Sequence, residues 1–181
     1  EASYNFKYTK EVKGVLLTST NKKAGDINKE ELAKIDSEEW IFDAEVHYNY
    51  NDNDFIFEKE LHLKDGCKIM YLENSCGLYN GSLGTCIIRN GIPFFKNKER
   101  EVQLVKIRRD KIRLGNNGEE IVESFIIQYP IKLAYAITIH KSQGLSLEEL
   151  TIDNKNMFLP AMKYVAFSRC KNPEHLYILR Q

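Results

Sequence analysis

The sequence has no long apolar run. None approaches the roughly 18 residues that a membrane-spanning helix needs, so we expect no membrane partner. Cysteine is scarce, with four in 181 residues, and no Cys-x-x-Cys pair occurs, which argues against a zinc site. A chain of this size can bury a core without a disulfide framework. We therefore expect reduced thiols, a cytoplasmic location and no metal held by the chain's own residues.

An excess of charge of one sign is also missing, because the formal net charge is zero. The distribution is uneven, however. Residues 26–60 contain twelve acids and three lysines, whereas residues 96–113 contain eight bases and three acids. Two solvated faces would explain both runs. Alternatively, the basic segment meets an anion and the acidic segment points away from it.

The chain lacks the G-x-x-x-x-G-K-[ST] loop that cradles nucleotide triphosphates, and no apolar run ends in Asp-Glu. The glycine-rich "NGSLGT" at Asn80 has no lysine and is typical of a hairpin turn. The first residue is Glu1 rather than Met, which favours a piece of a longer protein. These absences make a freestanding phosphotransferase a poor interpretation.

Two kinds of architecture alternate along the chain. "GVLLTST" from Gly14 predicts a buried strand, and Thr20 or Asn21 caps a helix that runs to about Ile35. From Trp40 to about Gln128 short β-rich runs are separated by turn signals, which is typical of a small barrel. After Pro130 the α/β pattern returns, with a strand in "KLAYAIT", a helical turn in "HKSQG", a strand in "EELTID", a helix in "FLPAMKYVAFSRC" and a strand in "HLYILR".

We therefore predict an α/β fold interrupted by a small β-barrel. The predicted division is residues 1–62 for the first part of the α/β domain, 63–128 for the barrel and 129–181 for the second part.

Two polar clusters follow predicted strands. "TIHKSQG", Thr138 to Gly144, begins a helical turn whose free N–H groups suit a phosphate, and "TSTN", Thr18 to Asn21, occupies the same position after the first strand. Both loops are expected at one edge of a sheet. The alternative is that His140 and Gln143 satisfy buried polar groups and that Thr18 to Asn21 is only a helix cap.

Arg169 lies late in a predicted helix. It could stabilise the helix C-terminus, or it could present a planar donor fork to a phosphate. The spacing alone leaves both possibilities open.

Four segments resemble, in family order, the superfamily 1B DNA helicases of the Pif and RecD type. "AYAITIHKSQGLSL" looks like motif V, and "KYVAFSRCKNPEHLYI" resembles motif VI. "VLLTSTNKKAGDINKEEL" is similar to the motif IV region. "LKDGCKIMYLENSCGLYNGSLGTCI" resembles the entry into an SH3-like insertion. The resemblance implies a second RecA-like domain without its own P-loop, carrying an inserted SH3-like barrel.

The resemblance also implies roles for individual residues of the site. Arg169 matches the motif VI arginine finger, and Gln143 and Gly144 match positions near the nucleotide cleft. Thr138, His140 and Lys141 match the face of motif V toward single-stranded DNA, and Thr20 and Asn21 match a DNA-phosphate position of motif IV. ATP and Mg²⁺ would be bound mainly by the N-terminal RecA-like domain, the expected partner domain. Movement along the strand would be 5′ to 3′.

The basic run "VQLVKIRRDKIRL", Val102 to Leu114, lies outside these motifs. Strand alternation predicts that Lys106 and Arg108 share one face, and we expect a turn at Asp110. This basic face is a further candidate for single-stranded DNA, although a solvated hairpin has the same composition.

Two other functions remain open at this point. The chain could be a non-catalytic nucleic-acid-binding module. It could also belong to the helicase subunit of a RecD-type exonuclease or to a conjugative relaxase.

Overall fold

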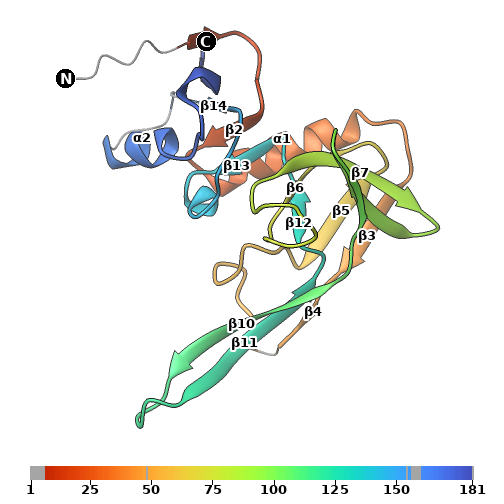
Figure 1. The fold of residues 1–181 in the computed structure, drawn as a ribbon, viewed down its shortest axis with the longest axis vertical. Helices are drawn as coiled ribbons and strands as arrows, with labels where there is room; N and C mark the ends of the chain where they lie inside the picture. The colour runs from red at the N-terminus through yellow and green to blue at the C-terminus, as the bar shows by residue number, and fades with distance from the viewer. Residues whose placement is uncertain (1–6, 48, 154, 156–159, 181) are drawn as a thin grey trace.

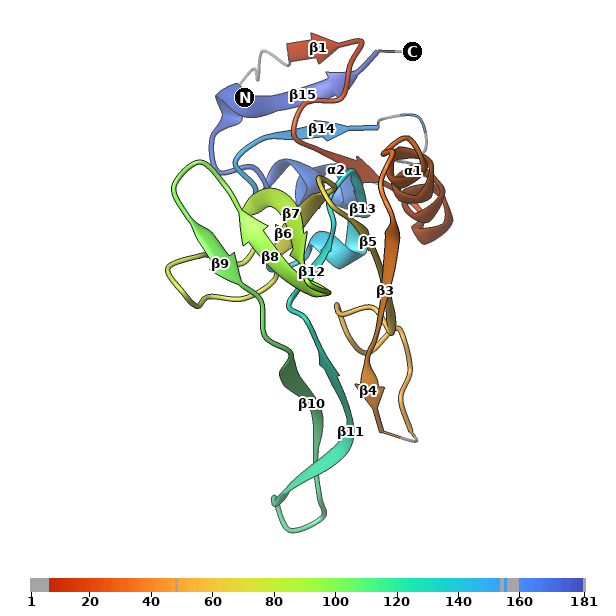
Figure 2. The ribbon, with the colours of Figure 1, turned by 90° about the vertical axis from the view of Figure 1, so that its right-hand side faces the viewer.

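The computed structural model describes residues 7–47, 49–153, 155 and 160–180. Figures 1 and 2 show a unit built on a parallel sheet, a β-rich unit beside it, and a long two-stranded arm that projects away from both. We call β10 (Ile107–Leu114) and β11 (Glu120–Gln128) the arm. The α/β class with an inserted β unit is as predicted.

The parallel sheet has the strand order β1-β15-β14-β2-β13 among the described residues. Its strands are β1 (Lys7–Thr9), β2 (Val15–Thr18), β13 (Ala136–Thr138), β14 (Leu150–Ile152) and β15 (Leu176–Leu179). β2, β13 and β14 are buried along their whole lengths, as expected for strands covered on both faces. The sequence pattern indicated all of them except β1.

Two helices accompany this sheet. α1 (Asn21–Ala33) begins at the predicted cap, where the Thr20 hydroxyl accepts a hydrogen bond from the Lys23 N–H at 3.3 Å. α2 (Pro160–Phe167) confirms the helix predicted in "FLPAMKYVAFSRC" but ends earlier, because Ser168, Arg169 and Cys170 lie outside it. Phe158 and Leu159 of that prediction lie outside the described residues. Short 3₁₀ turns occur at η1 (His140–Ser142), as predicted, and at η3 (Pro173–His175).

The β-rich unit contains an antiparallel sheet with the order β12-β6-β7-β8-β9, which we call the insert sheet. Its strands are β12 (Ile131–Leu133), β6 (Lys68–Tyr71), β7 (Leu83–Arg89), β8 (Ile92–Lys96) and β9 (Glu101–Gln103). A second pair, β3 (Glu39–Asp43) and β5 (Glu60–Lys64), packs beside it through a shared core. The SH3-like identity of this unit and the three residue ranges of the predicted domains remain predictions.

The turn expected at Asp110 is wrong. Asp110 does not reverse the chain, because it lies inside β10 and pairs with Phe125 of β11. The reversal comes at residues 115–118, where the Gly115 N–H bonds the Glu119 carbonyl and Gly118 adopts φ +81°. Glycine takes this conformation readily, whereas an aspartate inside a paired strand has no such need. β4 (Glu45–Val46) pairs with the base of β11.

The segment "KLAYAIT" also differs from its prediction as one strand. Residues 131–133 pair antiparallel with β6, whereas residues 136–138 pair parallel with β2 in the other sheet. Ala134 and Tyr135 make the crossing between the sheets, and both form hydrogen bonds with backbone groups around it. Only the end of "FIFEKELHL" forms a strand, as part of β5 (Glu60–Lys64), because Phe55 and Phe57 enter the core from a loop.

One core joins the two units. Met70 and Leu72 from the insert sheet pack in the same buried cluster as Val15 and Leu17 of the parallel sheet. The Lys68 ammonium donates to the Gly14 carbonyl at the start of β2, and burial lowers its pKa. The two units are therefore packed against each other and share one core, instead of being separate domains joined by a linker.

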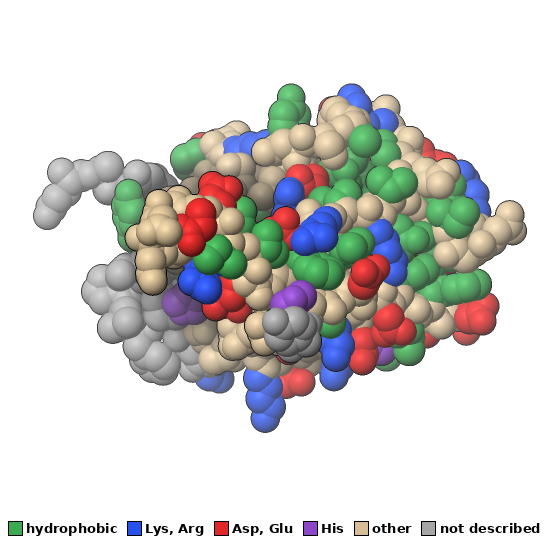
Figure 3. All heavy atoms as spheres, turned by 90° about the horizontal axis from the view of Figure 1, so that it is seen from below, with side chains coloured by type: hydrophobic (Ala, Val, Ile, Leu, Met, Phe, Trp, Pro, Cys, Tyr) green, Lys and Arg blue, Asp and Glu red, His purple; other side chains and the backbone are tan. Residues whose placement is uncertain are grey.

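Charges on the arm are largely paired. Arg109 bonds Glu73, and Lys111 lies 3.0 Å from Asp54 and 3.1 Å from Glu123. Figure 3, which views the molecule from below, shows acidic and basic side chains interspersed on that face. The basic run in the sequence is thus offset by acids that are distant along the chain.

Candidate functional site

The two predicted loops meet at one edge of the parallel sheet. β2 and β13 are neighbours in parallel register, with Thr18 paired to Thr138 at their carboxyl ends. The Thr138 hydroxyl donates to the Asn21 side-chain oxygen at 2.9 Å, and the Lys141 N–H donates to the Thr138 hydroxyl at 3.3 Å. Thr20 caps the helix at this edge. The sequence-predicted group of Thr20, Asn21, Thr138 and Lys141 is therefore brought together.

A cavity of about 450 Å³ opens beside this edge. It is bounded by α1, by the end of β13 and by the loop of residues 52–60. Asn21, Thr138 and Lys141 line it, together with Lys132 and Glu58, which the sequence motifs did not indicate. Lys132 has only 8% of its side chain exposed and lies 3.6 Å from Glu58. A lysine inside an otherwise apolar strand run was the signal that could have found it.

Lys141 is held by the chain rather than free in solvent. Its ammonium donates to the Asp52 carbonyl at 3.1 Å and to the Phe55 carbonyl at 2.6 Å. Burial lowers its pKa, and the positive charge of Lys132 lowers it further. A phosphate contact by Lys141 would therefore have to replace or share these two carbonyl partners.

The turn of residues 140–144 is exposed at its polar positions. His140, Gln143 and Gly144 all face solvent, whereas Ser142 is buried and its hydroxyl donates to the Ile139 carbonyl at 2.7 Å. His140 and Gln143 are thus not satisfying buried polar groups. Gly144 adopts φ +79° and a side chain there would meet no atom within 4 Å, so the turn leaves open space in front of its backbone.

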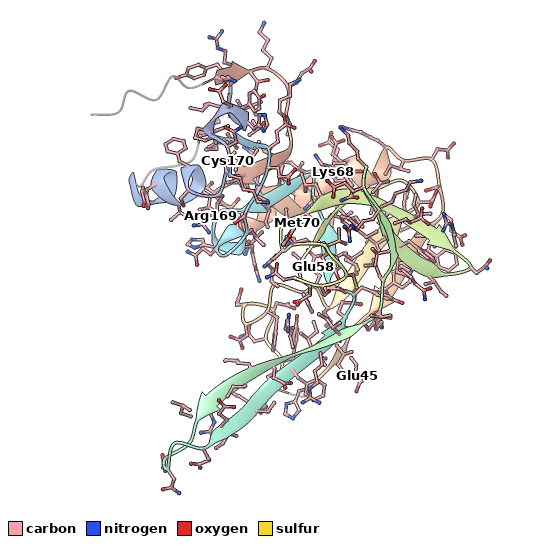
Figure 4. All side chains as sticks on the ribbon, in the orientation of Figure 1. Glu45, Glu58, Lys68, Met70, Arg169 and Cys170 are labelled. Carbon is pink, nitrogen blue, oxygen red and sulfur yellow. The ribbon has the colours of Figure 1, made fainter. Side chains whose placement is uncertain are left out.

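Arg169 follows α2 and is half-buried. Its Nε donates to the Val165 carbonyl at 3.3 Å, and another guanidinium nitrogen contacts the Ser168 hydroxyl at 3.0 Å. No carboxylate of the described residues forms an ion pair with it. Figure 4 shows it at the end of α2 next to Cys170. The guanidinium therefore contacts the C-terminal end of α2 and keeps donors that no acid in the described part of the chain neutralises.

Arg169 is tied to the turn through the backbone. The Leu147 N–H donates to the Arg169 carbonyl at 2.8 Å, and the Lys171 N–H donates to the Leu147 carbonyl at 2.8 Å. The motif V segment and the motif VI segment thus share a two-bond parallel bridge. This bridge fixes where the arginine lies relative to residues 140–147.

Lys106 and Arg108 lie at the base of the arm. Lys106 stands 5.7 Å from the Tyr129 ring centroid and Arg108 4.1 Å from that of Phe125. Lys106 precedes β10 instead of lying in it, so the shared face stays a prediction. Lys106 also donates to the Asp43 carbonyl at 2.5 Å, and Arg108 lies 2.6 Å from Asp110.

The remaining chemistry of the described residues is sparse. No group of three or more His, Cys, Asp or Glu side chains within them could hold a metal ion. All four cysteines are free, and Cys67 and Cys86 are buried side by side on the insert sheet. No helix in the described part of the chain is long and apolar enough to cross a membrane.

Known proteins that are similar to this chain in sequence and in structure are Pif1 helicases. No protein-family model matches the chain. The ATP-dependent DNA helicase Pif1 of Campylobacter jejuni is 35% identical over 187 residues, which cover 90% of this chain and 41% of the relative. The chain thus spans about two fifths of that relative's length.

Solved structures agree with the sequence match. Pif1 from Bacteroides in complex with ADP-AlF4 superposes with a TM-score of 0.76 at 26% identity, over 98% of this chain and 41% of the other. Bacteroides Pif1 bound to ssDNA superposes with a TM-score of 0.64 at 27% identity, over 91% of this chain and 40% of the other. The sequence match along most of the chain and the shared fold together show that this chain belongs to the Pif1 family of DNA helicases.

Proposed function

We propose that this chain is the C-terminal motor half of an ATP-dependent DNA helicase that translocates 5′ to 3′ on single-stranded DNA. The observation that carries the proposal is the backbone bridge between Leu147 and Arg169, which joins the turn of residues 140–144 to an arginine with no acidic partner among the described residues. A solved relative described as bound to ssDNA and another in complex with ADP-AlF4 support both ligand classes.

Arg169 is the proposed arginine finger. Phosphoryl transfer spreads negative charge over the equatorial oxygens of the transferred group, and a planar cationic fork stabilises that charge. Because its present contacts are a helix carbonyl and a hydroxyl, the guanidinium can exchange them for phosphate oxygens without breaking an ion pair. Gln143 and Gly144, exposed on the same bridged segment, are assigned to the nucleotide cleft.

ATP and Mg²⁺ are assigned mainly to an N-terminal RecA-like domain outside this chain. The residues present fit that division, because the chain has no P-loop, and its described part has an arginine without an acidic partner and no acidic cluster for a metal. Bound Mg²⁺ would offset charge on the phosphates. The chain's own part is to place Arg169 and to close against the other domain.

The DNA face is assigned to Thr138, His140 and Lys141, with Thr20 and Asn21 beside them. His140 is exposed and can meet a phosphate, whereas Thr138 and Lys141 hold the turn in shape through Asn21 and the loop at Asp52. Contacts to the phosphate backbone carry no sequence information, which suits translocation. Closure around ATP would move this face along the strand, as a ligand-biased two-state motion.

Replacing Arg169 in the intact helicase tests the proposal. We expect Arg169→Ala to lower ATP turnover by a factor on the order of 10³ with little change in ATP binding, and Arg169→Lys to rescue poorly because an ammonium has no planar fork. Arg180→Ala is the matched control, since Arg180 also follows the end of an element but covers the Tyr8 ring. Turnover near the wild-type rate in Arg169→Ala would show that Arg169 only stabilises the end of α2, and it would favour a non-catalytic, nucleic-acid-binding role for this chain.

A further inference from the structure

The connection between β6 and β7, residues 72–82, folds into a fixed turn. The Gly81 N–H donates to the Tyr71 carbonyl and the Ser82 N–H to the Tyr79 carbonyl, at 2.8 and 2.9 Å. The Tyr79 N–H donates to the Ser82 hydroxyl at 3.1 Å, and the Asn80 N–H to the Asn74 side chain at 2.9 Å. These bonds hold the turn in one shape.

This turn lies directly against the segment that carries the bridge to Arg169. A Cβ atom on Gly81 would lie 2.7 Å from the Ser146 carbonyl oxygen, closer than any side chain can sit. Ser146 immediately precedes Leu147, the residue bonded to the Arg169 carbonyl. The glycine backbone therefore touches the bridge with no side chain between them.

A second contact lies beside the first. The Lys171 ammonium stands 5.9 Å from the centre of the Tyr79 ring, and Lys171 is the other residue that Leu147 bonds. Tyr79 itself is 67% exposed, so its ring contributes little to the core. The turn thus reaches both sides of the bridge around Leu147.

Buried packing supports the same junction. Met70 and Leu72 at the end of β6 share a core cluster with Leu145, Leu147 and Ala166, which flank the bridge on the motif V and α2 sides. Interiors packed in this way transmit small displacements instead of absorbing them. A shift of the turn would therefore shift the bridge.

We propose that Gly81 is a positioning residue for Arg169: the close approach of the β6–β7 connection to Ser146 sets the position of the bridge and hence of the guanidinium. The inference rests on the proposed function, in which Arg169 meets the γ-phosphate. A misplacement of about 1 Å at such a group costs on the order of 10²-fold in rate. The insert sheet thereby acts on ATP turnover as well as on fold.

Gly81→Ala in the intact helicase tests this, with Gly66→Ala as the matched control. Both glycines have positive φ, +99° and +87°, and each lies in a connection next to β6, Gly66 before it and Gly81 after it, but a Cβ on Gly66 meets nothing within 4 Å. Both variants therefore carry backbone strain, and only Gly81→Ala displaces Ser146. We expect Gly81→Ala to lower kcat about 10-fold or more relative to Gly66→Ala, with KM for ATP within about twofold.

The Arg169→Ala background separates the two proposals. Adding Gly81→Ala to Arg169→Ala should cause no further loss if both act through the guanidinium. Equal kcat in Gly81→Ala and Gly66→Ala would overturn the positioning role while a large Arg169→Ala effect left the proposed function standing. If Arg169→Ala instead left kcat unchanged, the proposed function itself would be wrong.

Two less disruptive substitutions, both at Tyr79, test the inference if Gly81→Ala does not fold. Tyr79→Ala removes the ring beside Lys171 from an exposed position, whereas Tyr79→Phe keeps it. We expect a two- to threefold lower kcat in Tyr79→Ala alone, on the order of what a weak, exposed cation–π interaction supplies. Identical kcat values for the two Tyr79 variants would contradict the inference.

Discussion

Asn28 joins α1 to β13 with both ends of its side-chain amide. Its Nδ2 donates to the Ala136 carbonyl at 2.8 Å, and its Oδ1 accepts from the Ala136 N–H at 2.9 Å. The residue is buried, and β13 is at the edge of the sheet among the described strands, so the amide takes the place of a further strand. The Asn28 side chain therefore satisfies backbone hydrogen-bonding groups at the outer edge of β13, the strand that leads into the turn of residues 140–144.

We expect Asn28→Asp to lower the free energy of unfolding by about 2 kcal/mol or more, because a carboxylate oxygen would face the Ala136 carbonyl without a proton between them. Chemical denaturation of the purified chain measures this. Asn116→Asp, at the exposed tip of the arm, introduces the same group without burial and is expected to change little. Equal midpoints for the two variants would show that the Asn28 bonds add nothing to stability.

Among the secondary-structure elements, the arm combines cations with aromatic rings at its base and apolar residues near its tip. Lys106 and Arg108 lie over the rings of Tyr129 and Phe125, and Arg108 also pairs with Asp110. Arg109 and Lys111 of β10 pair with acids from other segments. The exposed apolar residues near the tip are Ile112, Leu114 and Val122. The base of the arm therefore offers two cations, each lying over an aromatic ring.

Replacing Lys106 and Arg108 by Gln should weaken binding of single-stranded DNA. The slope of log K against log salt should flatten by up to roughly 0.7 for each phosphate that the protein no longer neutralises. Fluorescence anisotropy over a salt series measures both quantities. Arg113→Gln removes a cation nearer the tip and serves as the control for charge alone. Unchanged affinity and slope in the double variant would assign DNA binding to the α/β unit only.

In the molecule as a whole, the parallel sheet and the insert sheet share one core. Ile126 of the arm's base and Met70 of the insert sheet lie in the same cluster as Ile137 and Leu150 of the parallel sheet. We therefore expect the isolated chain to unfold in a single transition. Its sequence contains no P-loop, so half of the proposed nucleotide site is absent from it.

The isolated chain is accordingly expected to fold and to hydrolyse no ATP. Circular dichroism during heating and a phosphate-release assay on the same preparation measure the two properties. The intact helicase is the positive control. Turnover above background by the pure chain, with contaminants excluded, would contradict the division of the site between two domains.

Local features of this protein could be predicted from its sequence. The cap at Thr20, the strand after Gly14, the helical turn at His140 and the missing P-loop all follow from residue type and neighbours within a few positions, where dihedral preference and hydrogen bonding act. The resemblance of the sequence motifs to those of known helicases indicated the family. These features place both candidate loops at strand ends, and parallel pairing then brings them to one edge.

Which distant segments meet was determined by tertiary packing. Periodicity reports burial but not the partner sheet, so "KLAYAIT" gave no sign that the chain changes sheets at Ala134. The burial of Lys132 beside Glu58, the carbonyls that hold Lys141, and the contact of Gly81 with Ser146 join residues between about 60 and 90 positions apart. Such contacts depend on sheet order and register, which are set by the packing of the whole chain and not by any local stretch of it.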